Sequence, residues 1–293
     1  MADFDVKAWR EARLKADRAA GLPQGNGRDD VTVVAYAFGA PEKMSDYGRA
    51  IELALRETYR RCGLLKTTLV VNRPTREIEA FAAACGARFR LDVDDSLKPG
   101  DIVGFSRNMI RTLPSRFDTP FMLNVHPDGF PLREGLDDFV GRYDYIGGPW
   151  DPSHDDWITR RLLTRWDGAG NGGFALRSRK ICEVGATAYR RFWKMIPDCY
   201  LLYEDVFFTR FLPRWQPGYA HTVSLAPCDE AAKFAFCENV AAQRSYGRLP
   251  FGFHSWRAFA QLRDLGTDPA ESGADIPYCG IIRANSKKAT KVP

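Results

Sequence analysis

Residues 31–38 read Val-Thr-Val-Val-Ala-Tyr-Ala-Phe, an apolar run that is rich in β-branched side chains. A short run of this kind, bounded by charged residues and glycine, is typical of a buried β-strand. Three later segments have the same character, and they are residues 67–71, 89–93 and 120–125. We therefore predict four strands, the third of which is short.

Between these strands, apolar residues recur at three- and four-residue spacing, which predicts a helix in each interval. We expect the first helix to begin at Ser45 and end at Gly63, and the second to begin at Pro74-Thr75 and end at Gly86. The third is expected to begin near Ile102. Strands that alternate with helices form parallel sheets through right-handed crossovers, and such sheets bind ligands beyond the carboxyl ends of their strands. The sequence thus predicts an α/β fold, a mixed and mainly parallel sheet flanked by helices in a single domain.

The two ends of the chain differ from this central region. Residues 1–30 predict a polar amphipathic helix anchored by Trp9 and Leu14, followed by a linker rich in Gly, Pro and Asn. Residues 31–283 are expected to form the main domain. Residues 284–293 predict a basic, solvated extension, with attraction to anionic lipid or to a phosphorylated acceptor as the alternative.

Composition argues against several classes of protein. Four of the five net positive charges come from Arg283, Lys287, Lys288 and Lys291, so the rest of the chain is nearly neutral and a poor match to nucleic-acid binding. No apolar run approaches the ~18 residues of a membrane span, and residues 1–30 lack the apolar core of a secretory signal, so we predict a cytoplasmic protein. The seven cysteines are odd in number and include no C-x-x-C pair, which argues against a disulfide framework and a thiolate zinc site. No G-x-G-x-x-G follows the first strand and the sequence has no P-loop, which argues against a Rossmann-type dinucleotide site and a P-loop nucleotide site.

His126-Pro-Asp-Gly129 follows the fourth predicted strand directly, so His126 and Asp128 leave the sheet at its carboxyl edge. Pro-Asp-Gly is also an ordinary turn sequence, which is the structural alternative. The functional interpretation is a divalent-metal site, in which a carboxylate suits Mg²⁺ or Mn²⁺ and a histidine favours Mn²⁺. Such a metal neutralises the charge that develops on a diphosphate leaving group.

Two glycine-containing segments are candidates for lining a ligand. Gly170-Asn-Gly-Gly-Phe-Ala-Leu-Arg177 surrounds one asparagine with three glycines, which permits close backbone approach to a ligand. We predict a ligand-lining loop at Asn171, Gly172 and Gly173 that re-enters the core at Phe174, with a tight bend as the alternative. Tyr145-Ile-Gly-Gly-Pro-Trp150 predicts a strand that ends in a rigid turn, whose aromatic side chains either line a sugar site or pack in the core.

Glu204 and Asp205 precede an apolar run that can enter a helix. Either they supply negative charge at the helix N-terminus, or one of them is a general base that removes the proton of an acceptor hydroxyl. The acidic pair Asp137-Asp138 is interpreted as helix N-terminal charge. His254 lies in a loop of glycine and aromatic residues, where binding of a metal or phosphate and a purely structural role are both open.

In this order along residues 31–256, the segments resemble the GT-A class of nucleotide-sugar glycosyltransferases. More closely, they are similar to a family of glycosyltransferase-like domains found in bacteria and large viruses. The resemblance implies a GT-A (Rossmann-like) fold, a UDP- or GDP-type sugar donor, a divalent metal (Mn or Mg), and a glycan or other hydroxyl as acceptor.

The same resemblance implies roles for particular residues. The metal-binding Asp-x-Asp motif of the class falls on His126-Pro-Asp128, where histidine replaces the first acid, and His254 would complete the metal site. Glu204-Asp205 would supply the base of an inverting enzyme, and Asp205 is the favoured residue. The loop at Ala37 and Phe38 would face the nucleotide base.

We therefore expect a metal-assisted, inverting glycosyltransferase that binds no nucleic acid. It would act at a membrane surface if the basic extension binds lipid. One alternative is a metal-dependent hydrolase or nucleotidyltransferase acting on the same donor. The other is a carbohydrate- or nucleotide-binding module without catalysis, which the histidine at position 126 favours.

Overall fold

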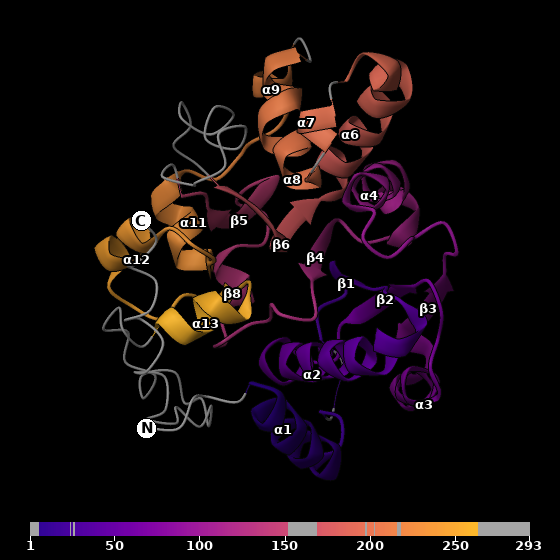
Figure 1. Ribbon diagram of the computed structural model, residues 1–293. Helices are drawn as coiled ribbons and strands as arrows, with labels where there is room; N and C mark the ends of the chain where they lie inside the picture. Colours follow the sequence, from indigo (N-terminus) through magenta and orange to yellow (C-terminus); the bar gives the residue numbers. More distant parts are fainter. Residues whose placement is uncertain are drawn as a thin grey trace, which may run out of the picture.

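In a computed structural model the chain forms a six-stranded sheet with the order β3-β2-β1-β4-β6-β5 (Figure 1). The structure describes residues 6–23, 25, 27–151, 169–196, 198–201, 203–215 and 218–262. Strands β1 to β4 are parallel, and β6 is antiparallel to both of its neighbours. This confirms the predicted mixed, mainly parallel sheet. The strands are β1 (Val31–Ala37), β2 (Lys66–Val71), β3 (Phe89–Val93), β4 (Phe121–Val125), β5 (Tyr145–Pro149) and β6 (Ala169–Ser178).

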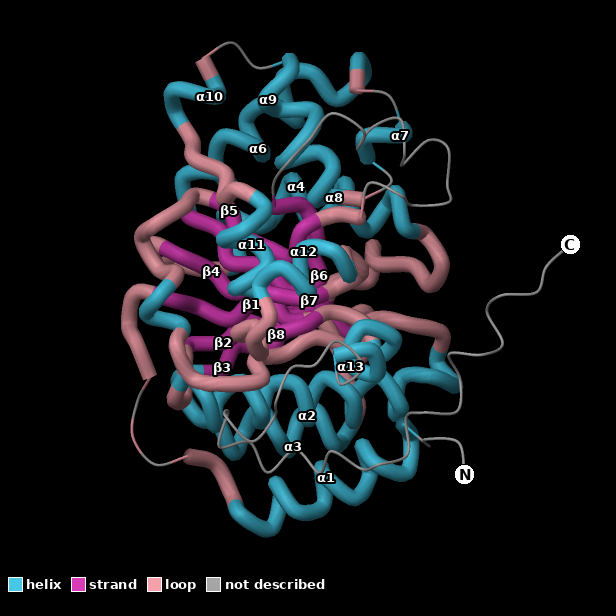
Figure 2. The backbone as a smooth tube through the Cα atoms, turned by 90° about the vertical axis from the view of Figure 1, so that its left-hand side faces the viewer, coloured by secondary structure: helices cyan, strands magenta, loops and turns pink. Residues whose placement is uncertain are grey.

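The four strands predicted from apolar runs are present within one residue of the expected bounds. Every residue of β1 is buried, because β2 and β4 flank it and helices cover both faces of the sheet (Figure 2). Strand β3 lies at the sheet edge, and its side chains are half-buried or exposed. The most continuous apolar run therefore occupies the most enclosed position, as expected for a parallel sheet.

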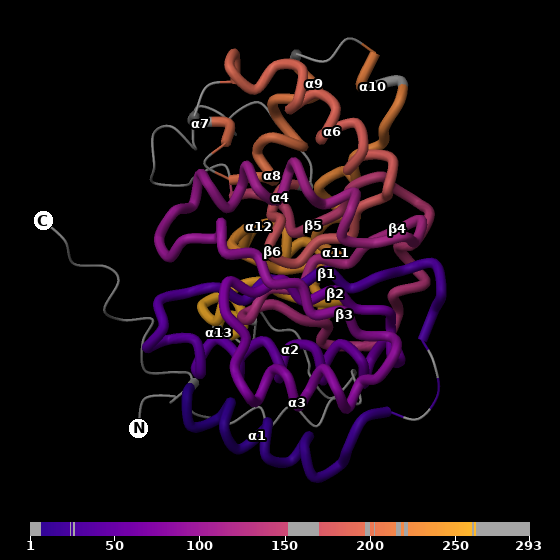
Figure 3. The backbone as a smooth tube through the Cα atoms, turned by 90° about the vertical axis from the view of Figure 1, so that its right-hand side faces the viewer, coloured from indigo at the N-terminus to yellow at the C-terminus, as the bar shows by residue number. Residues whose placement is uncertain are grey.

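Helices cover the two faces of the sheet in separate layers (Figures 2 and 3). On one face lie α2 (Met44–Cys62) and α3 (Arg76–Cys85), and on the other α4 (Ile102–Arg116) packs against α6 (Arg179–Phe192). Thr75 caps α3 as predicted, with its hydroxyl accepting from the Ile78 N–H. The predicted cap at Ser45 is wrong. Helix α2 begins one residue earlier, and the Ser45 hydroxyl accepts a bond from Arg49 inside the first turn.

Helix α1 (Val6–Ala20) lies beneath α2, outside the two layers that contact the sheet. Its apolar residues Trp9 and Leu14 are 9% and 3% exposed. On its other side, Arg13 and Arg18 form ion pairs with Glu57 and Glu52 of α2, at 2.7 and 2.5 Å. The helix is thus held by two apolar anchors and by paired charges. The predicted extension at 284–293 lies outside the described residues.

The remaining elements gather at one end of the sheet and above α4. A π-helical stretch, Phe207–Phe211, joins two short helices into one continuous helix from Glu204 to Trp215. Strands β7 and β8 form a two-stranded parallel sheet. The elements of this remaining part are α7 (Asp198–Leu201), α8 (Glu204–Val206), α9 (Leu212–Trp215), α10 (Tyr219–Thr222), α11 (Cys228–Phe234), β7 (Ala235–Phe236), α12 (Val240–Tyr246), β8 (Gly252–Phe253) and α13 (Trp256–Leu262). Elsewhere in the chain, 3₁₀ turns occur at Pro41–Lys43, Gly86–Arg88, Leu136–Asp138 and Trp193–Met195.

Two further expectations are changed by the structure. The predicted loop at residues 170–173 is instead the first half of β6, which is irregular because its pairing with β5 shifts at Gly148. Asp137 and Asp138 lie in a single 3₁₀ turn and are exposed. Among the described residues, no helix combines the length and apolar character that crossing a membrane requires.

Candidate functional site

The topology brings the candidate residues to one edge of the sheet. Strands β1, β4 and β5 run in the same direction and end at this edge, whereas the antiparallel β6 begins there. The chain order also reverses between β1 and β4, and parallel sheets bind ligands at such a switch point. The predicted site residues that end β1, β4 and β5 or begin β6 therefore lie at this edge, and they are Ala37, Phe38, His126, Trp150, Asn171, Gly172 and Gly173.

Two adjoining cavities open at this edge. The smaller, of about 470 Å³, lies between the end of β1 and the start of α4 and is lined by Ala37 and Phe38. The larger, of about 720 Å³, is lined by residues of the other predicted segments, Trp150, Asn171, Gly173, Glu204, Asp205 and His254. Both cavities share Ile102, Phe105 and His126 in their walls. Phe105 also stacks on Phe38, with ring centroids 4.9 Å apart.

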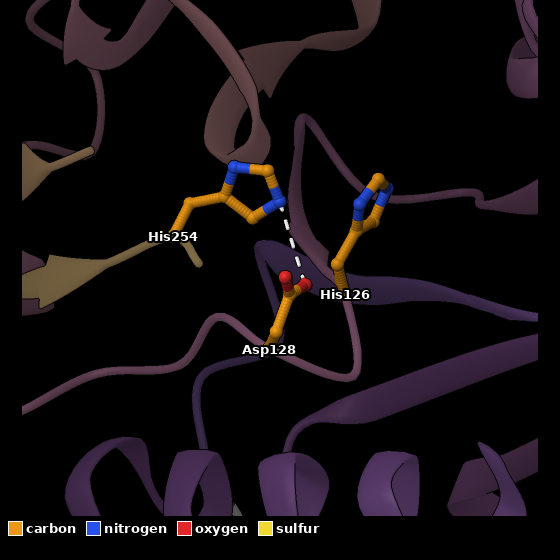
Figure 4. A group of neighbouring side chains, drawn as sticks. All are labelled: His126, Asp128 and His254. Carbon is orange, nitrogen blue, oxygen red and sulfur yellow. Dashed lines mark ion pairs between the residues drawn. The ribbon is translucent and has the colours of Figure 1, made fainter. Parts of the chain in front are cut away.

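The side chains of His126, Asp128 and His254 converge (Figure 4), and His126 lines both cavities while His254 lines the larger one. Each offers a ligand atom, and these atoms lie within 4.8 Å of one another. The His254 Nε2 is 3.4 Å from the Asp128 Oδ1, and the two imidazole rings are 5.4 Å apart at an angle of 76°. Two nitrogens and one oxygen at this spacing form a donor set suited to a divalent transition metal.

Backbone contacts hold this cluster from three elements. The His126 N–H donates to the Gly173 carbonyl of β6 at 3.1 Å, and the His254 N–H donates to the Phe236 carbonyl of β7 at 2.9 Å. The Ser255 N–H donates to the Asp128 carbonyl at 2.8 Å. Ser255 has a φ of +80°, a conformation that non-glycine residues rarely adopt and that is often found near functional sites.

The protonation states of His126 and Asp128 suit cation binding, whereas His254 has to release its proton before it can bind a metal. Burial, together with the charge of His254, lowers the pKa of His126 to about 4, so its imidazole is neutral at physiological pH. Burial alone would raise the pKa of Asp128, but the hydrogen bond from His254 lowers it to about 2. Burial likewise opposes the charged form of His254, yet Asp128 and Cys237 raise the pKa of His254 well above its ordinary value.

One buried polar atom in the cluster has no partner of its own. The Nε2 of His126 makes no hydrogen bond within the described part of the chain. A buried nitrogen left without a partner costs free energy, unless a ligand or ion completes its coordination. The residues present therefore fit a divalent cation.

No feature of the sequence singles out Cys237 among the seven cysteines. The pairing of Phe236 with Phe253 places Cys237 beside His254, the residues that follow these two strands. The Cys237 Sγ lies 3.8 Å from the His254 Nδ1 and accepts a bond from the Asn171 amide at 3.1 Å. Only this two-residue strand pairing reveals the contact, and no local sequence signal marks so short a sheet.

The acidic pair divides into two different environments. Glu204 accepts a bond from the fully buried Arg177, at 2.7 Å, and the Arg177 guanidinium lies over the rings of Tyr145 and Phe208. Glu204 therefore compensates a buried charge. In the sequence, Arg177 is only the last residue of the glycine-rich segment, and no role is predicted for it.

Asp205 instead accepts two backbone bonds, from Gly172 and Val206, each at 2.7 Å. Burial, and then the charge of Glu204, raises the pKa of Asp205 to about 8. Gly172 has no space for a Cβ, because the Glu204 carboxylate and the Arg177 guanidinium occupy that position. The glycine thus permits the close approach of β6 to α8, which presents Asp205 to the larger cavity.

Comparisons with known proteins were made for the whole chain. The family described as protein of unknown function, DUF5672, matches residues 105–254. No curated protein matches the chain. Core-mannan synthase A (CmsA/Ktr4) from Aspergillus fumigatus, solved in a Mn/GDP form, is 10% identical, covering 72% of this chain and 76% of that one, with a TM-score of 0.39.

Two further solved structures are similar to a comparable degree. A glycosyltransferase involved in glycosylation of the major capsid of PBCV-1 is 12% identical, covering 83% of this chain and 96% of that one, with a TM-score of 0.41. The mannosyltransferase Ktr4p from S. cerevisiae in complex with GDP is 10% identical, covering 79% of each chain, with a TM-score of 0.34. Similarities this distant do not bear on activity, which has to be argued from the residues of this chain.

Proposed function

The chain belongs to the DUF5672 family, and we propose that it transfers a sugar from a nucleotide-sugar donor to an acceptor hydroxyl. The observation that carries this proposal is the pair of adjoining cavities, which share a wall at His126, a member of the cluster of His126, Asp128 and His254. A nucleotide sugar has three parts: an aromatic base, a diphosphate and a sugar. The smaller cavity would hold the base, the cluster would hold the diphosphate through its metal, and the larger cavity would hold the sugar.

The nucleotide base is assigned to the smaller cavity. Phe38 and Phe105 give it a mostly apolar wall, which suits a flat aromatic base. The backbone beside it is fixed, because the Asn72 amide donates to the Gly39 carbonyl at 3.0 Å. Ala37 and Phe38 would contact the base of a UDP- or GDP-type donor, the class that the sequence resemblance implies.

His126, Asp128 and His254 would hold the divalent metal. A metal in this position would supply positive charge to the diphosphate as it leaves. Because two of the three donors are imidazoles, we propose Mn²⁺ rather than Mg²⁺, since Mg²⁺ prefers an all-oxygen shell. His126 of this cluster lies in the shared wall, where the diphosphate would pass from one cavity to the other.

Asp205 is assigned as the general base. Its carboxylate would take the proton of the acceptor hydroxyl as the oxygen attacks the anomeric carbon, which gives inversion of configuration. The two backbone N–H groups of Gly172 and Val206 fix its orientation. Glu204 is the weaker candidate, because its carboxylate is already bound to Arg177. We assign to Glu204 the role of balancing that buried charge.

The larger cavity would bind the donor sugar and the acceptor. The Trp150 indole packs against Gly170, where a Cβ would clash with the ring, and it also lines the cavity. An aromatic surface of this kind suits the C–H face of a sugar, while Asn171 provides hydrogen-bonding groups for its hydroxyls. Gly173 lies in the same wall, where a Cβ would meet the His254 imidazole.

Thermal unfolding in the presence of donors tests the proposal. A ligand that binds only the folded chain raises the melting temperature, by an amount that grows with the ratio of its concentration to its Kd. We expect one class among UDP-, GDP-, CMP- and dTDP-sugars to raise it, with a larger effect in Mn²⁺ than in Mg²⁺. Asp128→Ala should abolish the Mn²⁺-dependent part, and Asp138→Ala, which removes an exposed acid, should leave it unchanged.

Turnover then separates the alternatives. Transfer to an added acceptor supports the proposal. Consumption of the donor without acceptor would instead make the chain a hydrolase, and a thermal shift with no turnover would make it a binding module. No shift with any nucleotide in folded protein would contradict the donor assignment.

A further inference from the structure

Residues 190–195, which close α6 and form the 3₁₀ turn that follows it, make an exposed tip of mixed basic and apolar character, hereafter the α6 tip. Trp193 is 47% exposed and Met195 is 77% exposed. Exposed single hydrophobic residues are ordinary, but an indole and a thioether two residues apart within a basic segment are a local concentration.

Three of the six residues of the α6 tip are basic. Arg190, Arg191 and Lys194 form no ion pair with any residue that the structure describes, and Arg190 bonds only to the Thr187 hydroxyl, at 3.1 Å. The Arg191 guanidinium lies 5.2 Å from the Phe192 ring, and the Lys194 ammonium lies 5.5 Å from the Trp193 ring. Arg191 and Lys194 are therefore held against aromatic rings, and all three cations are available to a negatively charged surface.

The α6 tip lies on the same side of the molecule as the two cavities. Strand β6 begins at the cavity edge and ends at the opposite edge, beside the start of β4. Helix α6 begins beside the end of α4, where Arg179 donates to the Pro114 and Phe117 carbonyls, and it packs along α4. Its end is therefore directed toward the start of α4, where Ile102 lines both cavities. From there the chain continues to Tyr203 and Glu204, which line the larger cavity.

The other exposed large hydrophobic side chains of the described residues are found on this side as well. Tyr47 lines the smaller cavity, Tyr203 the larger and Ile102 both, and Val93 ends β3 at the same edge. The opposite edge of the sheet contributes none to this set. The exposed apolar surface is thus confined to the side on which the cavities open.

We propose that this side docks on an anionic lipid surface, with the α6 tip at the level of the headgroups. Tryptophan is favoured at membrane interfaces, and basic residues are attracted to anionic lipid. An acidic protein would also complement the charge, but lipid is favoured because Trp193 and Met195 are exposed at the same point as the cations. Docking in this way would turn both cavities toward acceptors held at the membrane, and it holds whatever reaction the chain performs.

Sedimentation of the full chain with vesicles tests the proposal. We expect binding to phosphatidylcholine vesicles that contain phosphatidylserine, no binding to phosphatidylcholine alone, and weaker binding as salt is raised. Each cation removed from the α6 tip should weaken partitioning about fivefold, so Arg190→Gln, Arg191→Gln and Lys194→Gln together should weaken it roughly 100-fold.

A matched control removes the same charge elsewhere. Lys66→Gln, Arg88→Gln and Arg90→Gln lie at the opposite edge of the sheet and should leave partitioning unchanged. Vesicles with brominated lipids should quench tryptophan emission in the wild type and quench it less in Trp193→Phe. Unchanged melting temperatures would show that each variant is folded.

Three results would overturn the proposal. The first is no sedimentation with anionic vesicles. The second is equal binding by the α6-tip variant and the wild type. The third is loss of binding on deletion of residues 284–293 when the α6-tip substitutions have no effect, since lipid attraction would then belong to the C-terminal segment.

Discussion

At the scale of single residues, Asp205 gives the proposed reaction its pH dependence. Burial first, and the charge of Glu204 second, raise its pKa to about 8, so the carboxyl is protonated below this pH and ionised above it. Because a general base must be ionised, we expect kcat/KM to rise about tenfold per pH unit up to about pH 8 and then to level off. Initial rates at low donor concentration would measure this, and a profile that falls over the same range would exclude Asp205 as the base.

Glu204 offers a second test of the same assignment. Glu204→Gln removes the neighbouring negative charge but keeps an acceptor for Arg177. The pKa of Asp205 should fall, so the rising limb of kcat/KM should move to lower pH. Asp138→Asn, which removes an exposed acid, should leave the limb in place. An unshifted profile in folded Glu204→Gln protein would assign the limb to another group.

Cys237 should affect metal binding without being a metal ligand. Its Sγ contacts the His254 Nδ1, which leaves the Nε2 of that ring directed at Asp128. Loss of such a supporting contact typically weakens metal affinity 10- to 100-fold, so we expect Cys237→Ala to weaken Mn²⁺ binding by about this factor. Titration followed by electron paramagnetic resonance would measure it, with Cys62→Ala as the control. A thiolate charge-transfer band in the Co²⁺-loaded protein would instead make Cys237 a direct ligand.

At the scale of elements, β6 is the strand of the six-stranded sheet whose first half the local pattern did not identify. The asparagine and glycines at residues 170–173 have low strand propensity, which led to the prediction of a loop. The segment is extended because β4 pairs with its second half and β5 follows it with shifted register. Long-range pairing therefore outweighed local preference, whereas the apolar strands β1 to β4 were identifiable from their own residues.

Two adjacent glycines of β6 should have separable effects. A Cβ at Gly173 would meet the His254 imidazole, and a Cβ at Gly172 would meet the Glu204–Arg177 pair and Asp205. We expect Gly173→Ala to weaken Mn²⁺ binding, and Gly172→Ala to retain Mn²⁺ binding but lose turnover. Calorimetric titration and initial rates on both variants would show this. Equal loss of metal affinity in the two variants would mean that the strand responds as a whole.

At the scale of the whole molecule, helix α1 connects the first helix layer with the end of the described chain. Trp9 packs against Trp256 and Phe259 of α13, with ring centroids 5.8 and 5.5 Å away, while the charged side of α1 pairs with α2. We expect Trp9→Ala to lower the free energy of unfolding by about 3 kcal/mol, which corresponds to a fall of roughly 6–12 °C in melting temperature. Trp193→Ala, at an exposed position, should change it by less than about 0.5 kcal/mol. Similar effects of the two substitutions would contradict the anchoring role of α1.

The sequence by itself determined the mainly parallel sheet, its first four strands, and the segments from which the candidate site is drawn. These features depend on the periodicity of neighbouring residues, which short-range physics sets and a single chain displays. Only the tertiary structure decided how the site residues divide their work. Arg177 forms an ion pair with Glu204, and two backbone N–H groups donate to the Asp205 carboxylate. The Cys237 Sγ contacts the His254 ring. Apart from the bond between the neighbours Val206 and Asp205, these contacts join residues 17 or more positions apart. The burial that shifts the pKa of Asp205 likewise exists only once the strands and helices have packed.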